Sequence, residues 1–172
     1  MFSDPAANLS KLGLNDGMRV VDLGAGSGFY SFEAARRVGQ NGRVYAVDVD
    51  KNLLERLRST GISNGLRNIE VVWGNAEKIG GTKLREMIAD RVVVSNILFQ
   101  IEKPDDFLLE IKRITKTGGK VLVVDWSELS VLSPKTLVPA AKAQLLFEKA
   151  GFKLDQSFSA GEHHYGLVFQ KV

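Results

Sequence analysis

The feature that most constrains the fold is a short apolar segment that runs directly into three alternate glycines. Val20–Leu23 is rich in the residues typical of a strand buried on both faces, and a helix is expected from about Phe29 to Val38. Gly24, Gly26 and Gly28 remove side chains from the turn, so that a ligand can lie against the backbone. The free N–H groups at the start of the helix point toward the same space. The segment therefore predicts a binding site for a nucleotide-like ligand.

The surroundings of this turn argue against a dinucleotide. The dinucleotide fingerprint G-x-G-x-x-G/A needs a small third residue, and that position is Phe29 here. Asp22 precedes the turn, where its carboxylate would repel a pyrophosphate and attract a cationic or amino-bearing ligand. Asp48 ends the next strand about 20 residues beyond the turn, where it can accept hydrogen bonds from both hydroxyls of a ribose. Alternatively, Asp48 or Asp50 caps the helix that follows.

Strands and helices alternate along the chain, a pattern that predicts a parallel sheet covered by helices on both faces. We expect strands at Arg19–Leu23, Arg43–Val47, Ile69–Trp73, Arg91–Val94, Lys120–Val124, Phe152–Phe158 and His164–Gln170. We expect helices at Phe29–Val38, Lys51–Ser59, Lys83–Ile88 and Ala140–Ala150, and one that starts after Pro104 and is ended by Gly118 and Gly119. The short link Ser159–Glu162 joins antiparallel neighbours, so the last strand must reverse direction.

The expected fold class is therefore α/β, a Rossmann-like, doubly wound, seven-stranded sheet that is mostly parallel with an antiparallel last strand. A length of 172 residues suits one domain, 1–172, with residues 18–172 as its core and 1–17 as an N-terminal lid or arm. Phe2–Leu12 could fold across the ligand, with Leu9 and Leu12 as apolar contacts, or could be a frayed terminus. Ser127–Pro139 contains two prolines and is expected to be an irregular loop over the ligand edge.

Composition excludes several classes of function. The chain has no cysteine, which rules out disulfides, thiolate metal sites and a cysteine nucleophile. Its net charge of +3 comes from basic residues spread among acidic ones, so nucleic acid is not an expected partner. No apolar run approaches the roughly 20 residues of a membrane helix, and the first residues lack the basic and apolar parts of a secretory signal. A cytoplasmic location is therefore expected.

The glycine-rich segment also carries a family resemblance. Val20–Phe29, with the sequence VVDLGAGSGF, resembles motif I of the class I S-adenosylmethionine (SAM) methyltransferases, and the likeness extends over about residues 18–172. Among these enzymes the chain is similar to the ubiquinone/menaquinone-biosynthesis-like small-molecule methyltransferases. The resemblance implies SAM as cofactor, S-adenosylhomocysteine (SAH) as product, and methyl transfer to an O, C or N nucleophile of a small molecule.

The resemblance also implies where the cofactor binds. Asn75 and Ala76 match the family's adenine-binding positions, although Asn75 replaces the usual Asp, and a plain turn is the alternative. Ser95 and Asn96 match the positions beside the methyl donor. The implied cofactor-binding residues are Asp22, Gly24, Ala25, Gly26, Gly28, Tyr30, Asp48, Val49, Asn75, Ala76, Ser95 and Asn96.

The substrate side is less defined. Ser95–Phe99 lacks the Pro-Pro signature of enzymes that methylate nucleobase or glutamine amide nitrogens, so those substrates are not expected. An RNA or protein methyltransferase, a SAM-binding module without catalysis and a nucleotide-dependent oxidoreductase remain as alternatives. The short N-terminal segment leaves the acceptor site open, or closed by another subunit, as in a homo-oligomer, or closed by a bulky partner.

Three residues are candidates for catalysis. Asp125 ends the fifth strand, and His163 and His164 flank the start of the last strand, so all should lie near one rim. Only one of the two histidines can face the cleft, because neighbours on a strand point to opposite faces. That histidine, or Asp125, could take a proton from a hydroxyl or amine, whereas packing and loop capping are the alternative roles. Adjacent histidines lack the spacing of metal ligands, so no metal is expected.

Overall fold

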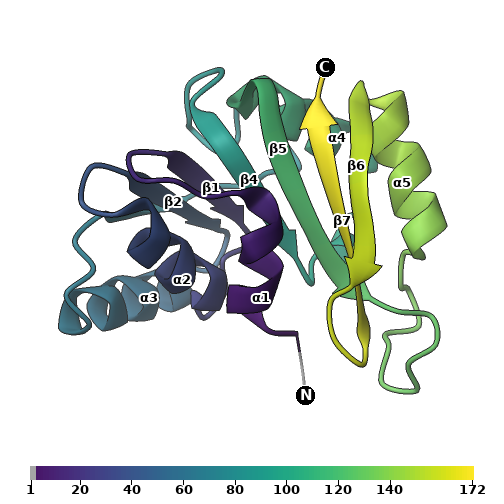
Figure 1. Ribbon diagram of the computed structural model, residues 1–172, viewed down its shortest axis with the longest axis horizontal. Helices are drawn as coiled ribbons and strands as arrows, with labels where there is room; N and C mark the ends of the chain where they lie inside the picture. Colours follow the sequence, from purple (N-terminus) through teal and green to yellow (C-terminus); the bar gives the residue numbers. More distant parts are fainter. Residues whose placement is uncertain (1–2) are drawn as a thin grey trace.

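The computed structural model describes residues 3–172 and contains a seven-stranded sheet with helices on both faces (Figure 1). The order of the strands across the sheet is β3-β2-β1-β4-β5-β7-β6. β7 runs antiparallel to both of its neighbours, β5 and β6, whereas the other neighbouring pairs are parallel. The predicted fold class is therefore confirmed. The strands are β1 (Arg19–Leu23), β2 (Arg43–Asp48), β3 (Ile69–Trp73), β4 (Ala89–Ser95), β5 (Thr115–Trp126), β6 (Phe152–Ser159) and β7 (His164–Lys171).

The helices form the two outer layers. They are α1 (Pro5–Leu9), α2 (Phe29–Val38), α3 (Lys51–Ser63), α4 (Pro104–Ile114) and α5 (Ala140–Lys149). Short 3₁₀ helices cover Ser10–Leu12 and Leu98–Gln100. Side chains of α1 and α2 pack on one face of the sheet with those of β1 and β4, and α3 packs against β2 on that face. Side chains of α4 and α5 pack on the other face.

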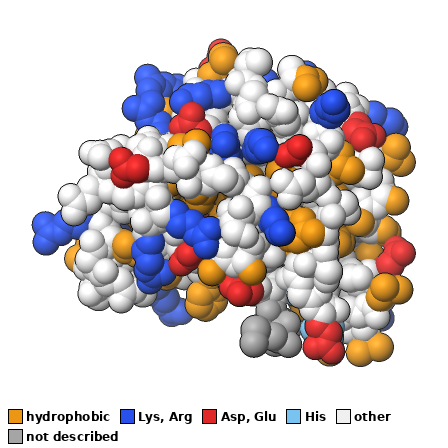
Figure 2. Space-filling view, viewed as in Figure 1, with side chains coloured by type: hydrophobic (Ala, Val, Ile, Leu, Met, Phe, Trp, Pro, Cys, Tyr) orange, Lys and Arg blue, Asp and Glu red, His pale blue; other side chains and the backbone are white. Residues whose placement is uncertain are grey.

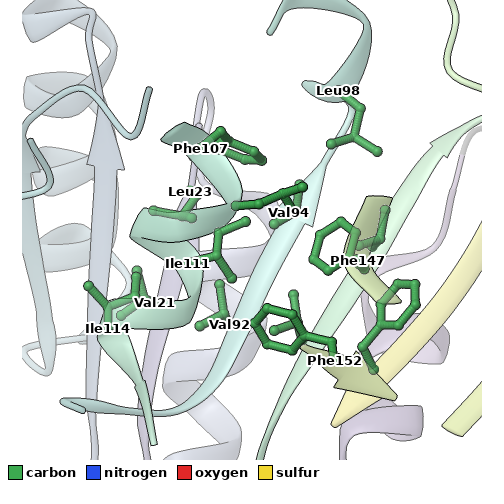
Figure 3. Packing of buried hydrophobic residues seen from close by; sticks show 14 of the residues in the cluster. Val21, Leu23, Val92, Val94, Leu98, Phe107, Ile111, Ile114, Phe147 and Phe152 are labelled. Carbon is green, nitrogen blue, oxygen red and sulfur yellow. The ribbon is translucent and has the colours of Figure 1, made fainter. Parts of the chain in front are cut away.

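Consecutive valines of the central strands supply both hydrophobic cores. Val20 belongs to the cluster under α1 and α2, whereas Val21 belongs to the cluster under α4 and α5. Figure 3 shows the second cluster, in which Phe107, Ile111 and Ile114 of α4 face the strands. Each of these helix residues is almost fully buried, which is worth ~1.5–3 kcal/mol per side chain. Burial on both faces explains why the strands read as continuous apolar runs rather than alternating ones.

The expected helix at Lys83–Ile88 is wrong. The segment forms turns without a helix, and Lys83 and Met87 adopt φ angles of 59° and 50°. These angles lie in the left-handed region, which a right-handed helix cannot contain. The backbone is instead held by α4, since the N–H of Met87 donates to the carbonyl of Arg113 over 2.9 Å. Contacts distant in the sequence therefore override the local helix propensity.

Other boundaries differ from the expected ones. Helix α4 ends at Ile114, and Gly118 and Gly119 lie inside β5, where the pairing with β4 shifts register. Gly118 has a φ of 74°, so it serves this irregularity rather than a helix end. Helix α3 continues to Ser63, and Gly61 lies buried within it.

The described part of the N-terminal segment is packed rather than frayed. Leu9 and Leu12 are buried in the cluster under α1 and α2, so they contact the core of the domain instead of reaching across a ligand. Phe2, the first residue of the expected lid, lies outside the described residues. Residues 127–139 form the irregular loop that was predicted, at the edge of the sheet where β5 ends (Figure 1). No helix within residues 3–172 has the length and apolar character needed to cross a membrane.

Candidate functional site

A cleft of about 760 Å³ opens at the carboxyl ends of the parallel strands. It lies where β1 pairs with β2 on one side and with β4 on the other, the topological switch point at which open α/β sheets bind ligands. Eleven of the twelve predicted cofactor-binding residues line it; they are Asp22, Gly24, Ala25, Gly26, Tyr30, Asp48, Val49, Asn75, Ala76, Ser95 and Asn96. The twelfth, Gly28, does not.

The three glycines of the turn have different roles. All three adopt positive φ, from 53° to 86°, a conformation that favours glycine. A Cβ on Gly26 would meet only the carbonyl oxygen of Gly24, at 3.9 Å, so Gly26 leaves open space in the cleft. A Cβ on Gly28 would lie 2.6 Å from Cγ of Leu57. Gly28 therefore allows α3 to pack against the turn; the resemblance implies that it binds the cofactor, but the structure does not place it in the lining of the cleft.

Asp48 and Asp50 divide the two roles that the sequence left open. Oδ2 of Asp48 accepts a hydrogen bond of 2.9 Å from the N–H of Gly26, and its Oδ1 accepts one of 2.9 Å from the N–H of Asp50. Asp50 caps α3, because its Oδ1 accepts from the N–H groups of Asn52 and Leu53. The cap thus belongs to Asp50, and the Asp48 carboxylate is left at the cleft beside the glycine turn.

The cleft is electrostatically negative. Asp22, Asp48, Asp50 and Glu77 line it, and among residues 3–172 no Lys or Arg does. Asp22 is buried and accepts a hydrogen bond of 2.7 Å from the hydroxyl of Ser31. Burial, together with the nearby charge of Asp48, raises the pKa of Asp22 to about 6. Such a cleft favours a cationic ligand over a phosphate.

The loop after β3 is held in place by a buried carboxylate that the sequence analysis missed. Glu110 of α4 is fully buried and accepts hydrogen bonds from the N–H of Gly80 at 2.7 Å and from the N–H and hydroxyl of Thr82. Arg113 pairs with it at 2.7 Å and also donates to the carbonyl of Leu84. The only signal in the sequence is an acid and a base three residues apart on an otherwise apolar helix face.

Asn75 occupies this same loop. Its N–H donates to the carbonyl of Gly81 over 3.0 Å, and its side-chain Oδ1 accepts from the N–H of Glu77 over 2.9 Å. An amide oxygen has two lone pairs, so Oδ1 keeps capacity for one further donor in the cleft. Oε1 of Glu77 accepts from the N–H groups of Glu102 and Lys103, which ties this loop to the start of α4.

Asn96 and Tyr30 also line the cleft. Asn96 follows β4 with a φ of 55°, and its Oδ1 is buried without a hydrogen-bond partner. The hydroxyl of Tyr30 accepts from Nδ2 of Asn8 at 2.9 Å and lies 2.8 Å from the hydroxyl of Ser3. Ser3 and Pro5 themselves line the cleft, so the N-terminal segment forms part of its wall. Both residues belong to the Phe2–Leu12 segment that was expected to fold across the ligand.

The structure separates the three catalytic candidates. Asp125 is fully buried and does not line the cleft. Its carboxylate accepts from the N–H groups of Leu98 and Trp126, at 2.9 and 2.8 Å, and burial raises its pKa. Asp125 therefore caps the loop. It was expected to lie at the rim as a candidate base, and the structure instead buries it away from the cleft.

The two histidines point to different surroundings: His164 begins β7, whereas His163 lies in the turn before it. His164 lines the cleft and packs against Trp126, with the two rings tilted by 35° and their centroids 4.5 Å apart. Neither ring nitrogen of His164 has a hydrogen-bond partner. Burial lowers the pKa of His164, and the charge of His163 lowers it further. His163 does not line the cleft; its Nδ1 lies 2.9 Å from the hydroxyl of Ser130. Within residues 3–172 no group of His, Asp and Glu side chains is arranged to hold a metal ion.

Comparisons with known proteins agree on one family. A family model described as "Methyltransferase domain" matches residues 14–162. The ubiquinone/menaquinone biosynthesis C-methyltransferase UbiE of Vibrio campbellii is 31% identical over 81% of this chain and 52% of its own length. The UbiE protein of Haemophilus ducreyi is 32% identical over 67% of this chain and 44% of its own. The chain thus spans about half the length of the curated relatives it matches.

A solved structure covers nearly the whole domain. The crystal structure of a SAM-dependent methyltransferase from Aquifex aeolicus superposes with a TM-score of 0.89 and 28% identity, covering 99% of this chain and 90% of that one. The [4+2]-cyclase SpnF, at 14% identity and a TM-score of 0.84, shares the fold alone.

Proposed function

Because the chain belongs to the methyltransferase domain family, we propose that it is a SAM-dependent enzyme that methylates a small organic molecule. When bound, SAM supplies a methyl group on a positively charged sulfur that leaves readily. The protein then has to bind the cofactor and the acceptor, orient them and exclude water. Alignment of the two reactants can lower the activation barrier by ~7–11 kcal/mol. This explains why one weakly basic side chain at the cleft is compatible with the activity.

The residues at the cleft fit this cofactor. Gly26 leaves room for it beside the backbone, and the carboxylate of Asp48 can accept from ribose hydroxyls while it keeps the N–H of Gly26. The unpartnered Oδ1 of Asn96 is a buried acceptor suited to an ammonium group. We assign adenine to Asn75 and Ala76, whose loop is held by Glu110.

One observation carries the proposal: the glycine turn opens into a cleft lined by four carboxylates and, within residues 3–172, by no Lys or Arg. A dinucleotide would bring a pyrophosphate into this negative environment, whereas SAM brings a sulfonium and an ammonium. The charges therefore support SAM over a nicotinamide cofactor.

A small-molecule acceptor is supported by the size and surface of the domain. The cleft volume of about 760 Å³ lies within the range of small-molecule sites. Figure 2 shows Lys and Arg mixed with Asp and Glu on the face it presents, without the single-sign stripe expected of an RNA-binding surface. The acceptor could be covered by a second copy of the chain in a homo-oligomer, because the described N-terminal segment contributes only Ser3 and Pro5 to the wall.

The test of the cofactor is calorimetric titration with SAH, SAM and NADH. We expect saturable binding of SAH and SAM, and none of NADH. Binding of NADH without SAH would overturn the proposal. The test of the reaction is release of SAH from SAM in the presence of small-molecule, RNA or protein acceptors. If the protein binds SAM but none of the acceptors leads to release of SAH, it is a non-catalytic SAM-binding module instead.

A further inference from the structure

We propose that His164 and Trp126 form the acceptor-binding end of the cleft and select uncharged molecules that present an O–H or N–H donor to His164. This inference rests on the proposed function and names the class of substrate for the same cleft. It assigns a role to a buried imidazole that the cofactor does not explain.

The position of the two residues follows from the order of the strands. The proposed cofactor residues extend from the ends of β1, β2, β3 and β4, whereas Trp126 ends β5 and His164 begins β7. The two residues are paired across these strands, and both line the cleft. Since β4 and then β5 and β7 follow β1 in the sheet, this pair lies at the end of the cleft away from Asp48. A second molecule in the same cleft would therefore meet it.

The hydrogen-bonding state of His164 leaves both of its ring nitrogens available to a ligand. Among residues 3–172, three buried side-chain polar atoms have no hydrogen-bond partner: Oδ1 of Asn96 and both ring nitrogens of His164. His164 is only 3% exposed. An unsatisfied buried polar group costs ~1–3 kcal/mol, so such groups are rare in folded proteins. All three atoms belong to residues of one cleft, where ligands can satisfy them.

The protonation state of His164 decides what it can recognise. Burial lowers its pKa and keeps the ring neutral at physiological pH. A neutral imidazole has one accepting and one donating nitrogen. The accepting nitrogen can receive the O–H or N–H of an acceptor, and can then take its proton to become imidazolium while the bonding electron pair stays on the acceptor atom.

The charge of the cleft sets the selection against anions. A carboxylate or phosphate on the acceptor would be buried in a cleft that Asp22 and Asp48 also line, and no Lys or Arg among residues 3–172 lines the cleft to pair with it. Burying an unpaired anion costs far more than a neutral donor does. Phosphorylated and carboxylated acceptors are therefore disfavoured, whereas neutral hydroxyl and amino compounds are accepted.

The experiment uses four aromatic probes that differ only in their polar group: phenol, aniline, benzoate and phenyl phosphate. The chain has two histidines, so the ring signals of isotope-labelled histidine resolve His164 with His163 as an internal control. Each probe is titrated near neutral pH into the SAH complex, whose formation is first confirmed by calorimetry. Phenol and aniline should move the His164 signals saturably and leave those of His163 in place, and benzoate and phenyl phosphate should move neither.

Variants separate recognition from folding. His164→Phe keeps a ring against Trp126 but removes both nitrogens, and should weaken phenol binding about tenfold, the equivalent of ~1.4 kcal/mol, while SAH binds as in the parent. His163→Gln should bind phenol as the parent does. The inference is overturned if SAH binds and phenol and aniline leave His164 unmoved at millimolar concentration, or if the anionic probes bind as well as the neutral ones. Failure of SAH to bind would instead refute the proposed function.

Discussion

The backbone N–H of Gly26 donates a hydrogen bond of 2.9 Å to Oδ2 of Asp48, which joins the turn after β1 to the end of β2. The two residues are 22 positions apart, and each was singled out separately in the sequence as a cofactor-binding residue. Their bond restrains a turn whose glycines have more backbone freedom than other residues. The cradle, by which we mean the glycine turn together with Asp48, is therefore formed without a ligand, and this lowers the entropy cost of binding.

Replacing Asp48 by Ala should weaken SAH binding by about 10–100-fold, because hydrogen bonds to a charged group are worth ~1.5–3 kcal/mol. The variant also leaves the N–H of Gly26 without its acceptor. Calorimetric titration with SAH measures the effect. The matched control is Asp105→Ala, which removes an exposed carboxylate of α4 and should bind SAH with the parent affinity. An unchanged dissociation constant for Asp48→Ala would refute the assignment of the ribose.

Replacing Gly26 by Ala should abolish SAH binding, because the new methyl group would occupy the space of the ligand. The substitution also strains the backbone, since φ is 53°, at a cost of ~1–2 kcal/mol. Gly65→Ala isolates that strain: Gly65 has a φ of 74°, follows α3 and has nothing within 4 Å of its ideal Cβ. Thermal unfolding should show similar losses of stability for both variants, and only Gly65→Ala should retain SAH binding. Equal binding by the two would contradict the cradle.

The parts of the site that could be predicted from the sequence depend on local chemistry. Gly26 and Asp48 each stand at the end of an apolar strand, and parallel strands bring their carboxyl ends to one edge. Their meeting therefore follows from the alternation of elements alone. The same geometry predicts that only one of His163 and His164 faces the cleft. It does not predict which one, because that depends on the register of β7 with β5.

The parts that could not be predicted depend on contacts distant in the sequence. Gly28 has the residue type and spacing of a ligand glycine, yet its space is filled by Leu57 of α3. Asp125 ends a strand at the correct edge, yet its carboxylate turns inward to the N–H of Leu98. The turn at Lys83 exists because Glu110 and Arg113 hold the flanking backbone. No periodicity in the sequence reports such interactions.

Replacing Asp22 by Asn should stabilise the protein at neutral pH. The folded pKa of Asp22 is raised from 3.8 to about 6, so the favourable contribution of its protonated form is fully present below pH 3.8 and is lost as the pH rises through 6. The shift corresponds to a cost of up to about 3 kcal/mol at pH 7. Asn avoids the buried charge and keeps an acceptor for Ser31.

Urea unfolding of the parent and of Asp22→Asn at a series of pH values measures this effect. The difference in unfolding free energy should grow between about pH 4 and pH 6 and then level off. A difference that does not change with pH would show that Asp22 titrates normally in the folded protein. The Asp22 carboxylate is also a candidate partner of the cofactor's ammonium group, which SAH retains. The more stable variant should therefore bind SAH more weakly, because a residue that favours binding can lower the stability of the fold.

Replacing Glu110 by Gln should lower the unfolding free energy by about 3–5 kcal/mol, since it leaves Arg113 without its charge partner at a buried site. Burial alone would raise the pKa of Glu110, but hydrogen bonds from Arg113, Thr82 and Gly80 outweigh it and lower the pKa. The parent should therefore lose this part of its stability as the pH falls below about 4.5, and Glu110→Gln should lack that loss. Urea unfolding measures both effects.

The control for this prediction is Glu55→Gln on α3. Glu55 and Arg58 are also an acid and a base three residues apart, with an N–O distance of 3.0 Å, but their side chains are 62% and 52% exposed. Water and salt screen an exposed ion pair, so Glu55→Gln should barely change the unfolding curve. The double variant Glu110→Gln/Arg113→Met removes both charges and should be more stable than Glu110→Gln alone. If Glu110→Gln and Glu55→Gln unfold alike, the buried pair does not hold the loop that carries Asn75. The order of this loop, which we propose to bind adenine, must then come from Glu77 and its bonds to the start of α4.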